Sequence, residues 1–197
     1  KKIQPDIIFH LAAQPLVIEG YTNPKETYEA NTLGTLNILE SIKNNKIKTS
    51  IIITTDKVYK NDDTKKKFTE NDELGGSDPY SSSKHLAELI VQNYNLNFLK
   101  KMKLNVVTAR AGNVIGGGDR GENRLIPDFF KASKKVTLRS PTATRPWQFI
   151  IDPLDGYLRL AKFIYKRKLK NDQYSWNFAP NNQIPKNVKY IIETLNT

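Results

Sequence analysis

The chain lacks cysteine altogether and contains only two histidines, His10 and His85, among its 197 residues. Without cysteine there is no disulfide framework, no thiolate nucleophile and no cysteine-ligated zinc or iron–sulfur centre, and two histidines leave few ligands for any other metal site. No apolar run approaches the ~20 residues that a membrane-spanning helix needs, and the N-terminus does not resemble a signal peptide. We therefore expect a cytoplasmic protein with no metal and no membrane contact.

A glycine-rich phosphate-binding turn is also missing. A dinucleotide-binding fold begins with a strand and a G-x-G-x-x-G turn that opens a helix. Here the chain enters a strand pattern after residue 5, and its glycine run at 116–118 leads into a polar loop. We therefore expect a fold that is incomplete at the N-terminus, and the stop inside a helical pattern predicts a truncated C-terminus.

Negative charge is scarce relative to positive charge: 31 Lys and Arg face 20 Asp and Glu, giving a formal net charge of +11. Such a charge is typical of nucleic-acid-binding proteins. However, 24 of these 31 cations are lysines scattered in short clusters, and no basic stripe with interleaved aromatic residues is present. We therefore attribute the positive net charge to solvated lysines on the surface. The alternative from another functional class is a basic nucleic-acid-binding domain, whose binding to any duplex would depend steeply on salt.

Strand patterns alternate with helix patterns along the chain. Predicted strands cover about 6–9, 50–55, 104–109, 136–138, 147–151 and 174–178, and predicted helices cover 24–41, 80–101, 126–133, 154–166 and a segment from 188 onward. This alternation predicts an α/β fold, a doubly wound, Rossmann-like parallel sheet with helices on both faces. We expect Trp147 and Phe149 to lie in the core, and the alternative is a platform on which a base stacks.

The sharpest candidate site is Tyr80 with Lys84, at the start of the long helix. Positions i and i+4 share a helix face, so the phenol and the ammonium are expected to point the same way. A nearby cation stabilises a phenolate and lowers the pKa of tyrosine from ~10 toward that of a useful general base. The pair is therefore a candidate for proton abstraction.

Small and polar residues follow the predicted strands. Residues 10–14 include Ala12 and Ala13, which would let a flat ligand lie close to the backbone. Thr55 and Asp56 follow the second strand with a hydroxyl and a carboxyl group, and Asn113 follows the third. Because functional groups collect at the carboxyl ends of parallel strands, we expect these residues to form one site with Tyr80.

Several motifs together carry a family resemblance. They are FHLAAQPLV (9–17), TTDKVY (54–59), GGSDPYSSSKHLAELI (75–90), ARAGNVIGGGD (109–119), RLIPD (124–128), RPWQ (145–148) and WNFAP (176–180). The combination resembles the extended short-chain dehydrogenase/reductases, the NAD-dependent epimerase/dehydratase family, over nearly the whole chain. Within that family, the sequences of these motifs are most similar to those of the CDP-glucose 4,6-dehydratase branch. The resemblance implies NAD as cofactor and a lyase reaction that converts CDP-glucose to CDP-4-keto-6-deoxyglucose in deoxysugar biosynthesis, such as that of lipopolysaccharide O-antigen.

The resemblance also implies roles for individual residues. Tyr80 takes the proton from the 4-hydroxyl of the sugar, Lys84 tunes Tyr80, Thr55 hydrogen-bonds the same hydroxyl, and Asp56 protonates the departing hydroxyl. Further implied cofactor-binding residues, beside Tyr80 and Lys84, are Ala12, Ala13, Gln14 and Asn31. Five of the seven arginines lie between residues 110 and 145. Since arginine suits forked recognition of phosphate, we expect Arg124 and Arg145, with Asn113, to bind the diphosphate of the substrate.

Lys57 departs from the pattern of the related dTDP-glucose dehydratases, which carry glutamate after the Thr-Asp pair. It acts either as the base at carbon 5, if its pKa is lowered far enough, or as electrostatic support for the enolate.

We expect residues 1–110 to form part of a dinucleotide-binding domain and residues 111–197 to mix sheet elements with a small substrate-binding part. The full-length protein is expected to be a homo-oligomer, a dimer or tetramer. These 197 residues alone are expected to bind NAD poorly and to be inactive or poorly soluble. An epimerase or reductase of the same superfamily, which would not need Asp56 as an acid, is the alternative within the same class.

Overall fold

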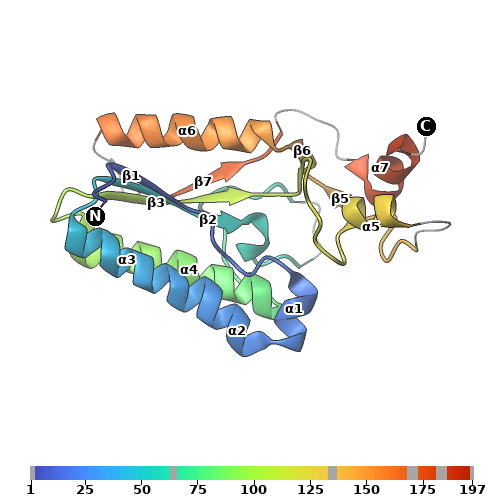
Figure 1. Ribbon diagram of the computed structural model, residues 1–197, viewed down its shortest axis with the longest axis horizontal. Coiled ribbons are helices and arrows are strands. Elements are labelled where there is room, and N and C mark those ends of the chain that lie inside the picture. The colour runs from blue at the N-terminus through green and yellow to red at the C-terminus, as the bar shows by residue number, and fades with distance from the viewer. Residues whose placement is uncertain (1–2, 63–65, 133–136, 168–172, 181–185, 196–197) are drawn as a thin grey trace.

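The computed structural model describes residues 3–62, 66–132, 137–167, 173–180 and 186–195, and its elements form three layers (Figure 1). The middle layer is a parallel sheet of β1 (Ile7–His10), β2 (Thr49–Thr55), β3 (Asn105–Ala111) and β7 (Ser175–Phe178), in that order. Helix α6 (Ile151–Lys166) covers one face, and α3 (Gly34–Asn45) and α4 (Pro79–Tyr94) cover the other. The doubly wound α/β sheet predicted from the sequence is confirmed.

Each face of the sheet has its own hydrophobic core. Successive residues of a strand point to opposite faces, so Ile51 and Val107 pack with the core beneath α6, whereas Ile52 and Val106 pack with the core beside α3 and α4. All four side chains are fully or almost fully buried. A parallel sheet covered on both faces requires such continuous apolar runs, which is why the central strands were predictable.

The helical segment before β2 is more complex than predicted. It comprises α1 (Val17–Thr22), α2 (Pro24–Tyr28), a π-helical turn (Glu29–Leu33) and α3, which ends at Asn45 before the left-handed Lys46. The predicted helix over 24–41 is therefore present and longer, whereas α1 was not predicted. Leu33 is 49% exposed although it lies within this helical segment, because it belongs to the π turn, whose wider winding shifts the face that points inward.

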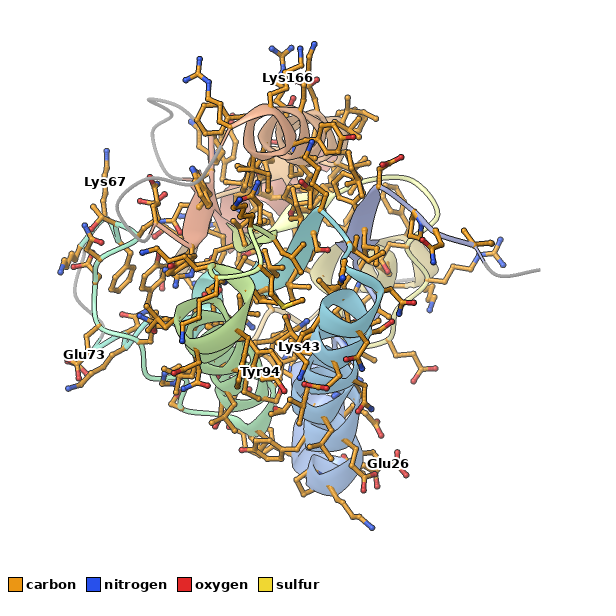
Figure 2. The ribbon with its side chains drawn as sticks, turned by 90° about the vertical axis from the view of Figure 1, so that its left-hand side faces the viewer. Glu26, Lys43, Lys67, Glu73, Tyr94 and Lys166 are labelled. Atoms are coloured by element: carbon orange, nitrogen blue, oxygen red, sulfur yellow. The ribbon has the colours of Figure 1, made fainter. Side chains whose placement is uncertain are left out.

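The long helix predicted over 80–101 is α4 followed by a π-helical turn, Asn95–Leu99. Several of its leucines do not face the sheet: Leu86, Leu89 and Leu96 are 38–49% exposed, and the smaller Ala87 and Val91 are buried instead. Seen from the end of the molecule, α3 and α4 lie side by side, and the labelled Lys43 and Tyr94 face each other between them (Figure 2).

Short elements lie beyond the carboxyl ends of the strands (Figure 1). They are β4 (Val114–Ile115), α5 (Leu125–Lys131), β5 (Thr144–Arg145), β6 (Gln148–Phe149), β8 (Lys186–Asn187) and α7 (Val188–Leu195). Of the strand predicted over 147–151, only the two residues of β6 are strand. The strand predicted over 136–138 is not formed by Thr137 and Leu138, and Val136 lies outside the described residues.

The core position predicted for Phe149 is wrong, because its side chain is 58% exposed. Gln148 is buried in its place and donates a hydrogen bond from Nε2 to the Phe178 carbonyl at 3.0 Å. Trp147 is partly buried, with its indole nitrogen donating to the Lys186 carbonyl. Within the described ranges, no helix is both long and apolar enough to cross a membrane.

Candidate functional site

The carboxyl end of β2 carries Thr55 and Asp56. Thr55 ends the strand, and its hydroxyl accepts the Lys57 amide at 3.3 Å, which starts a 3₁₀ turn over Asp56–Val58. The same hydroxyl donates to Asp56 Oδ1 at 3.2 Å. Burial raises the pKa of the Asp56 carboxyl, against the lowering effects of that hydrogen bond and of the Lys57 charge. Asp56 therefore keeps its proton to a higher pH than an exposed aspartate does.

The end of β3 meets Asp56 from the neighbouring strand. A side-chain carbon added at Gly112 would lie 2.4 Å from Pro146 Cγ and 3.1 Å from Asp56 Oδ2, so only glycine allows this approach. Arg145 precedes Pro146, is exposed, and lowers the pKa of Asp56 through its charge. The structure thus brings Arg145, a predicted substrate-binding residue, near Asp56.

Tyr80 lies in the first turn of α4, which is fixed by a capping box. Asp78 accepts the Ser81 amide at 3.0 Å, and the Ser81 hydroxyl accepts the Asp78 amide at 3.1 Å. Burial raises the pKa of the Tyr80 phenol, and a hydrogen bond with the Thr55 side chain lowers it. The negative charges of Asp56 and Asp78 raise it further, while Arg124 lowers it. Tyr80, Thr55 and Asp56 therefore form one contiguous group, as the sequence predicted.

Lys84 is buried one turn after Tyr80, and its Nζ donates to the Ile53 carbonyl at 3.1 Å. Burial lowers the pKa of Lys84 to about 8, and the charge of Glu88 opposes this. Burial lowers the pKa of His10 at the end of β1, and the charge of Lys84 lowers it further. Lys84 thus lies beneath the ends of β1 and β2, and its influence on the Tyr80 phenolate stays a prediction.

Lys57 is exposed and lies on the Tyr80 side of the site. Its Nζ is 6.0 Å from the centre of the Tyr80 ring. Of the two lysines in the predicted catalytic set, Lys84 is buried under the strand ends and Lys57 is open to solvent.

The loop after β1 is held in shape by Asn31. The Asn31 side chain, 1% exposed, accepts the Gln14 amide at 2.8 Å and donates to the Gln14 carbonyl at 3.0 Å and to Ser83 Oγ at 2.9 Å. The Gln14 side chain donates to Thr27 at 2.7 Å. Ala12 is exposed and Ala13 partly so, beside this ordered loop. Asn31 and Gln14 therefore shape the loop, and their contact with a cofactor stays a prediction.

Arg124 precedes α5 and pairs with Asp119. Arg124 Nη1 lies 3.0 Å from Asp119 Oδ2, and the Gly121 amide donates to the other oxygen of Asp119 at 3.0 Å. Because its charge acts on Tyr80, Arg124 belongs to the same region as the strand ends. Asn113 follows β3, and its carbonyl accepts the Gln148 amide at 3.0 Å. Substrate binding by Arg124 and Asn113 stays a prediction.

Arg110 is one of the five arginines between residues 110 and 145, but it is 3% exposed and paired with Glu88. Arg110 Nη2 lies 2.9 Å from Glu88 Oε2, between β3 and α4. Sequence reasoning missed this pair. The available signals were a charged residue inside an apolar strand pattern and a glutamate four residues after Lys84, on the same helix face.

Comparisons with known proteins agree on the family. The family model described as "NAD dependent epimerase/dehydratase family" matches residues 1–174. The CDP-glucose 4,6-dehydratase of Salmonella typhimurium is 40% identical over 205 aligned residues, which cover 100% of this chain and 57% of that protein. The dTDP-D-glucose 4,6-dehydratase of Dictyostelium discoideum is 33% identical, with 80% and 38% covered.

A solved structure agrees on the fold. The UDP-glucose 4-epimerase of Thermotoga maritima with UDP-glucose matches with a TM-score of 0.82 at 21% identity, over 98% of this chain and 60% of that one. The chain spans little more than half the length of the Salmonella relative.

Proposed function

Since the chain belongs to the NAD dependent epimerase/dehydratase family, as its motifs predicted, we propose that the full-length protein dehydrates a nucleotide sugar. The substrate is CDP-glucose and the product CDP-4-keto-6-deoxyglucose, formed by oxidation at carbon 4, loss of water across carbons 5 and 6, and reduction at carbon 6. The observation that carries the proposal is the group of Tyr80, Thr55 and Asp56 at one strand end, in a chain 40% identical to a CDP-glucose 4,6-dehydratase.

NAD fits the carboxyl ends of β1 and β2. Ala12 and Ala13 carry only methyl groups there, which leaves room for a flat ring. Within the described residues, Lys84 Nζ makes one hydrogen bond, to Ile53, so two of its hydrogens are free to donate to a ribose. Gln14 and Asn31 would support the ligand through the loop that they shape. When bound, NAD supplies the hydride acceptor and donor.

Tyr80 and Asp56 have complementary proton roles in this proposal. Tyr80 takes the proton of the 4-hydroxyl while Thr55 hydrogen-bonds the same oxygen, and Asp56 later gives a proton to the departing 6-hydroxyl. The negative charge of Asp56 raises the pKa of Tyr80. The raised pKa of Asp56 favours its protonated form, which is the acid that the elimination step requires. A protonated Asp56 also carries no negative charge, so it no longer disfavours the Tyr80 phenolate.

Lys57 supports the enolate in this proposal rather than acting as the base at carbon 5. The Lys57 side chain is exposed and its Nζ lies 6.0 Å from the centre of the Tyr80 ring, close enough for its charge to act on the reacting sugar. A charged ammonium beside Tyr80 stabilises negative charge that develops on the sugar.

Arg124 and Arg145, together with Asn113, bind the substrate diphosphate in this proposal. Both arginines are in electrostatic reach of the site, Arg124 acting on Tyr80 and Arg145 on Asp56. Their guanidinium groups offer the paired donors that phosphate oxygens accept.

The test incubates the purified full-length protein with CDP-glucose and NAD and follows the 4-keto-6-deoxy product by NMR. We expect turnover in the native protein, none with Tyr80→Phe, and with Asp56→Asn an oxidised sugar that retains its 6-hydroxyl. Change at carbon 4 without loss of water would favour the epimerase or reductase alternative. No sugar conversion, with tight and steeply salt-dependent binding to duplex DNA, would favour the basic nucleic-acid-binding domain.

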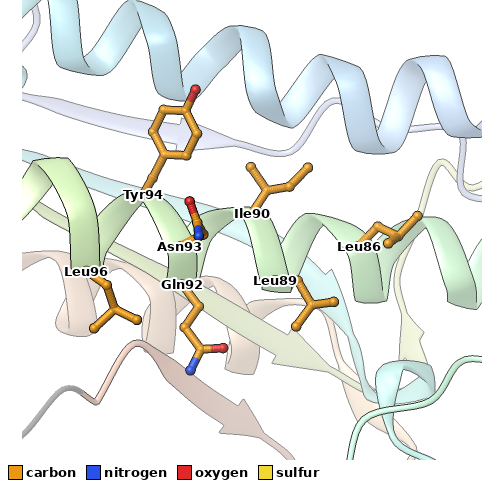
Figure 3. Close-up of a pocket in the computed structure, with 7 residues that line it drawn as sticks. All are labelled: Leu86, Leu89, Ile90, Gln92, Asn93, Tyr94 and Leu96. Atoms are coloured by element: carbon orange, nitrogen blue, oxygen red, sulfur yellow. The ribbon is translucent and has the colours of Figure 1, made fainter.

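We also propose that the full-length protein is a homo-oligomer in the cytoplasm, acting in deoxysugar biosynthesis. The proposal that the protein is a homo-oligomer is supported by the surface of α4, along which lies an open hollow of about 560 Å³ (Figure 3). Its lining includes Leu86, Leu89, Ile90, Tyr94 and Leu96. Leu86, Leu89 and Leu96 among them are exposed, and exposed apolar residues gathered along one helix are typical of a surface that pairs with a second copy.

A further inference from the structure

A cluster of buried polar side chains lies between α4 and the sheet, outside the residues used by the proposed mechanism. At its centre Glu88, 5% exposed, faces Arg110, 3% exposed. Arg110 donates from Nε to Glu88 Oε1 at 3.0 Å and from Nη2 to Oε2 at 2.9 Å. The hydroxyls of Thr54 and Thr108 donate to the same carboxylate, one to each oxygen. The four acceptor sites of the Glu88 carboxylate are thereby filled.

The cluster joins the elements that carry the proposed site. Glu88 lies one helical turn after Lys84, and because positions i and i+4 share a face, both side chains point at the sheet and both are buried. Thr54 directly precedes Thr55 on β2, and Arg110 is the penultimate residue of β3. Glu88 therefore connects α4 to the ends of two neighbouring strands.

Arg110 extends the connection to the edge of the sheet. Its Nη1 donates to the Tyr59 hydroxyl at 2.8 Å, and Tyr59 donates to Asn177 Oδ1 on β7 at 2.6 Å. The Asn177 amide donates to Glu70 Oε1 at 2.8 Å. One charge pair thus links α4, three strands and the segment between β2 and α4.

Stability alone does not require charges at this place. Burying a carboxylate and a guanidinium costs desolvation that their attraction seldom exceeds, and an apolar pair of similar volume often serves a fold as well or better. A fully hydrogen-bonded charge pair differs from an apolar pair in two respects. Its directional bonds allow one register of α4 on the sheet, and it sets a negative charge one turn from Lys84.

We propose that Glu88 is a positioning residue for the site, which acts through Arg110, Thr54 and Thr108 to hold α4 in register and to keep the Lys84 ammonium in place beneath the strand ends. The groups that face Lys84 are Glu88 on its own helix, His10 from β1 and the Ile53 carbonyl of β2, with Arg110 of β3 behind Glu88. The expected effect of Glu88 on turnover rests on the proposed function, whereas its effect on Lys84 does not.

The test compares the double variant Glu88→Gln/Arg110→Met, which removes both charges at similar volume, with Asn95→Ala. Asn95 is a matched control, since it is 1% exposed, hydrogen-bonds across to the Val106 carbonyl, and lies at the far end of α4 from Tyr80. Lys84 is titrated by NMR in the full-length protein with ¹³C-lysine, and its signal is assigned with Lys84→Arg. In the native protein we expect a midpoint near 8, apart from exposed lysines at ~10.4.

We expect the midpoint to fall by on the order of half to one unit in the double variant and to stay unchanged in Asn95→Ala. For CDP-glucose we expect kcat to fall roughly tenfold with KM nearly unchanged, because Glu88 does not contact substrate. An unchanged Lys84 midpoint in the folded double variant would overturn the inference. Since the titration needs no substrate, absence of dehydratase turnover would contradict the proposed function and leave the Lys84 result decisive for Glu88.

Discussion

Lys84 illustrates at the residue scale how the site is maintained at a cost in stability. Its ordinary pKa of 10.5 is lowered to about 8 by burial, so between these values the unfolded chain binds a proton that the folded chain does not. The stability of the fold therefore rises as pH rises through this window, and the penalty is greatest below about 8.

Replacing Lys84 with methionine is accordingly expected to stabilise the protein while abolishing turnover. The expected gain in the free energy of unfolding at pH 7 is on the order of 2–3 kcal/mol, and it shrinks toward zero above pH ~10.5. Urea unfolding of the native and variant proteins at pH 7 and pH 10.5 measures it. A variant that is less stable than the native protein at pH 7 would show that the ammonium is better solvated than its burial indicates.

Lys57 permits a sharper test of its role at carbon 5. We expect Lys57→Met to slow the elimination step yet to leave exchange of the carbon 5 hydrogen with solvent deuterium detectable, because the ammonium supports the enolate without removing the proton. The measurement is NMR of CDP-glucose recovered after partial turnover in D₂O. Complete loss of exchange, with oxidation at carbon 4 retained, would instead make Lys57 the base.

At the scale of elements, the first turn of α4 sets both the position and the proton affinity of Tyr80. Asp78 caps the helix through Ser81, and its charge raises the pKa of the Tyr80 phenol. Gly76 lies so close that an added side-chain carbon would be 2.3 Å from the Ser81 carbonyl carbon. The end of the helix is therefore fixed by backbone packing as well as by its cap.

Two substitutions at Asp78 separate these effects. Asp78→Asn keeps a capping oxygen and removes the charge, so the pKa of Tyr80 falls and the acidic limb of the kcat–pH profile, where the Tyr80 base becomes protonated, moves to lower pH with little change in stability. Asp78→Ala also removes the cap, and its free energy of unfolding is expected to fall by about 1 kcal/mol. Equal pH profiles for Asp78→Asn and the native protein would exclude electrostatic control by Asp78.

The elements also show where sequence patterns stop being informative. The central strands were predictable because a parallel sheet covered on both faces needs uninterrupted apolar runs. The face of α4 was not, since apolar residues at helical spacing are the same pattern whether they meet a core or another protein surface. Only the contacts of the neighbouring strands select Ala87 and Val91 for the core and leave Leu89 exposed.

For the whole molecule, the exposed face of α4 predicts association. We expect Leu89→Lys in the full-length protein to shift sedimentation equilibrium toward the monomer, because a charge at the centre of the face must be desolvated on pairing. Leu158→Lys is the matched control, as Leu158 is 61% exposed on α6, on the opposite side of the sheet. An unchanged mass for both variants would place any oligomer interface elsewhere.

The sequence by itself determined the fold class, the family and the group of Tyr80, Thr55 and Asp56, because periodicity and short-range motifs carry that information along the chain. The tertiary structure alone decided the partners of charged groups that lie far apart in sequence. It pairs Arg110 of β3 with Glu88 of α4, and it shows that Asn31 holds the loop after β1 through hydrogen bonds to Gln14. The reason is physical: a buried charge or amide is placed by the partners that satisfy it, and those partners come from other elements.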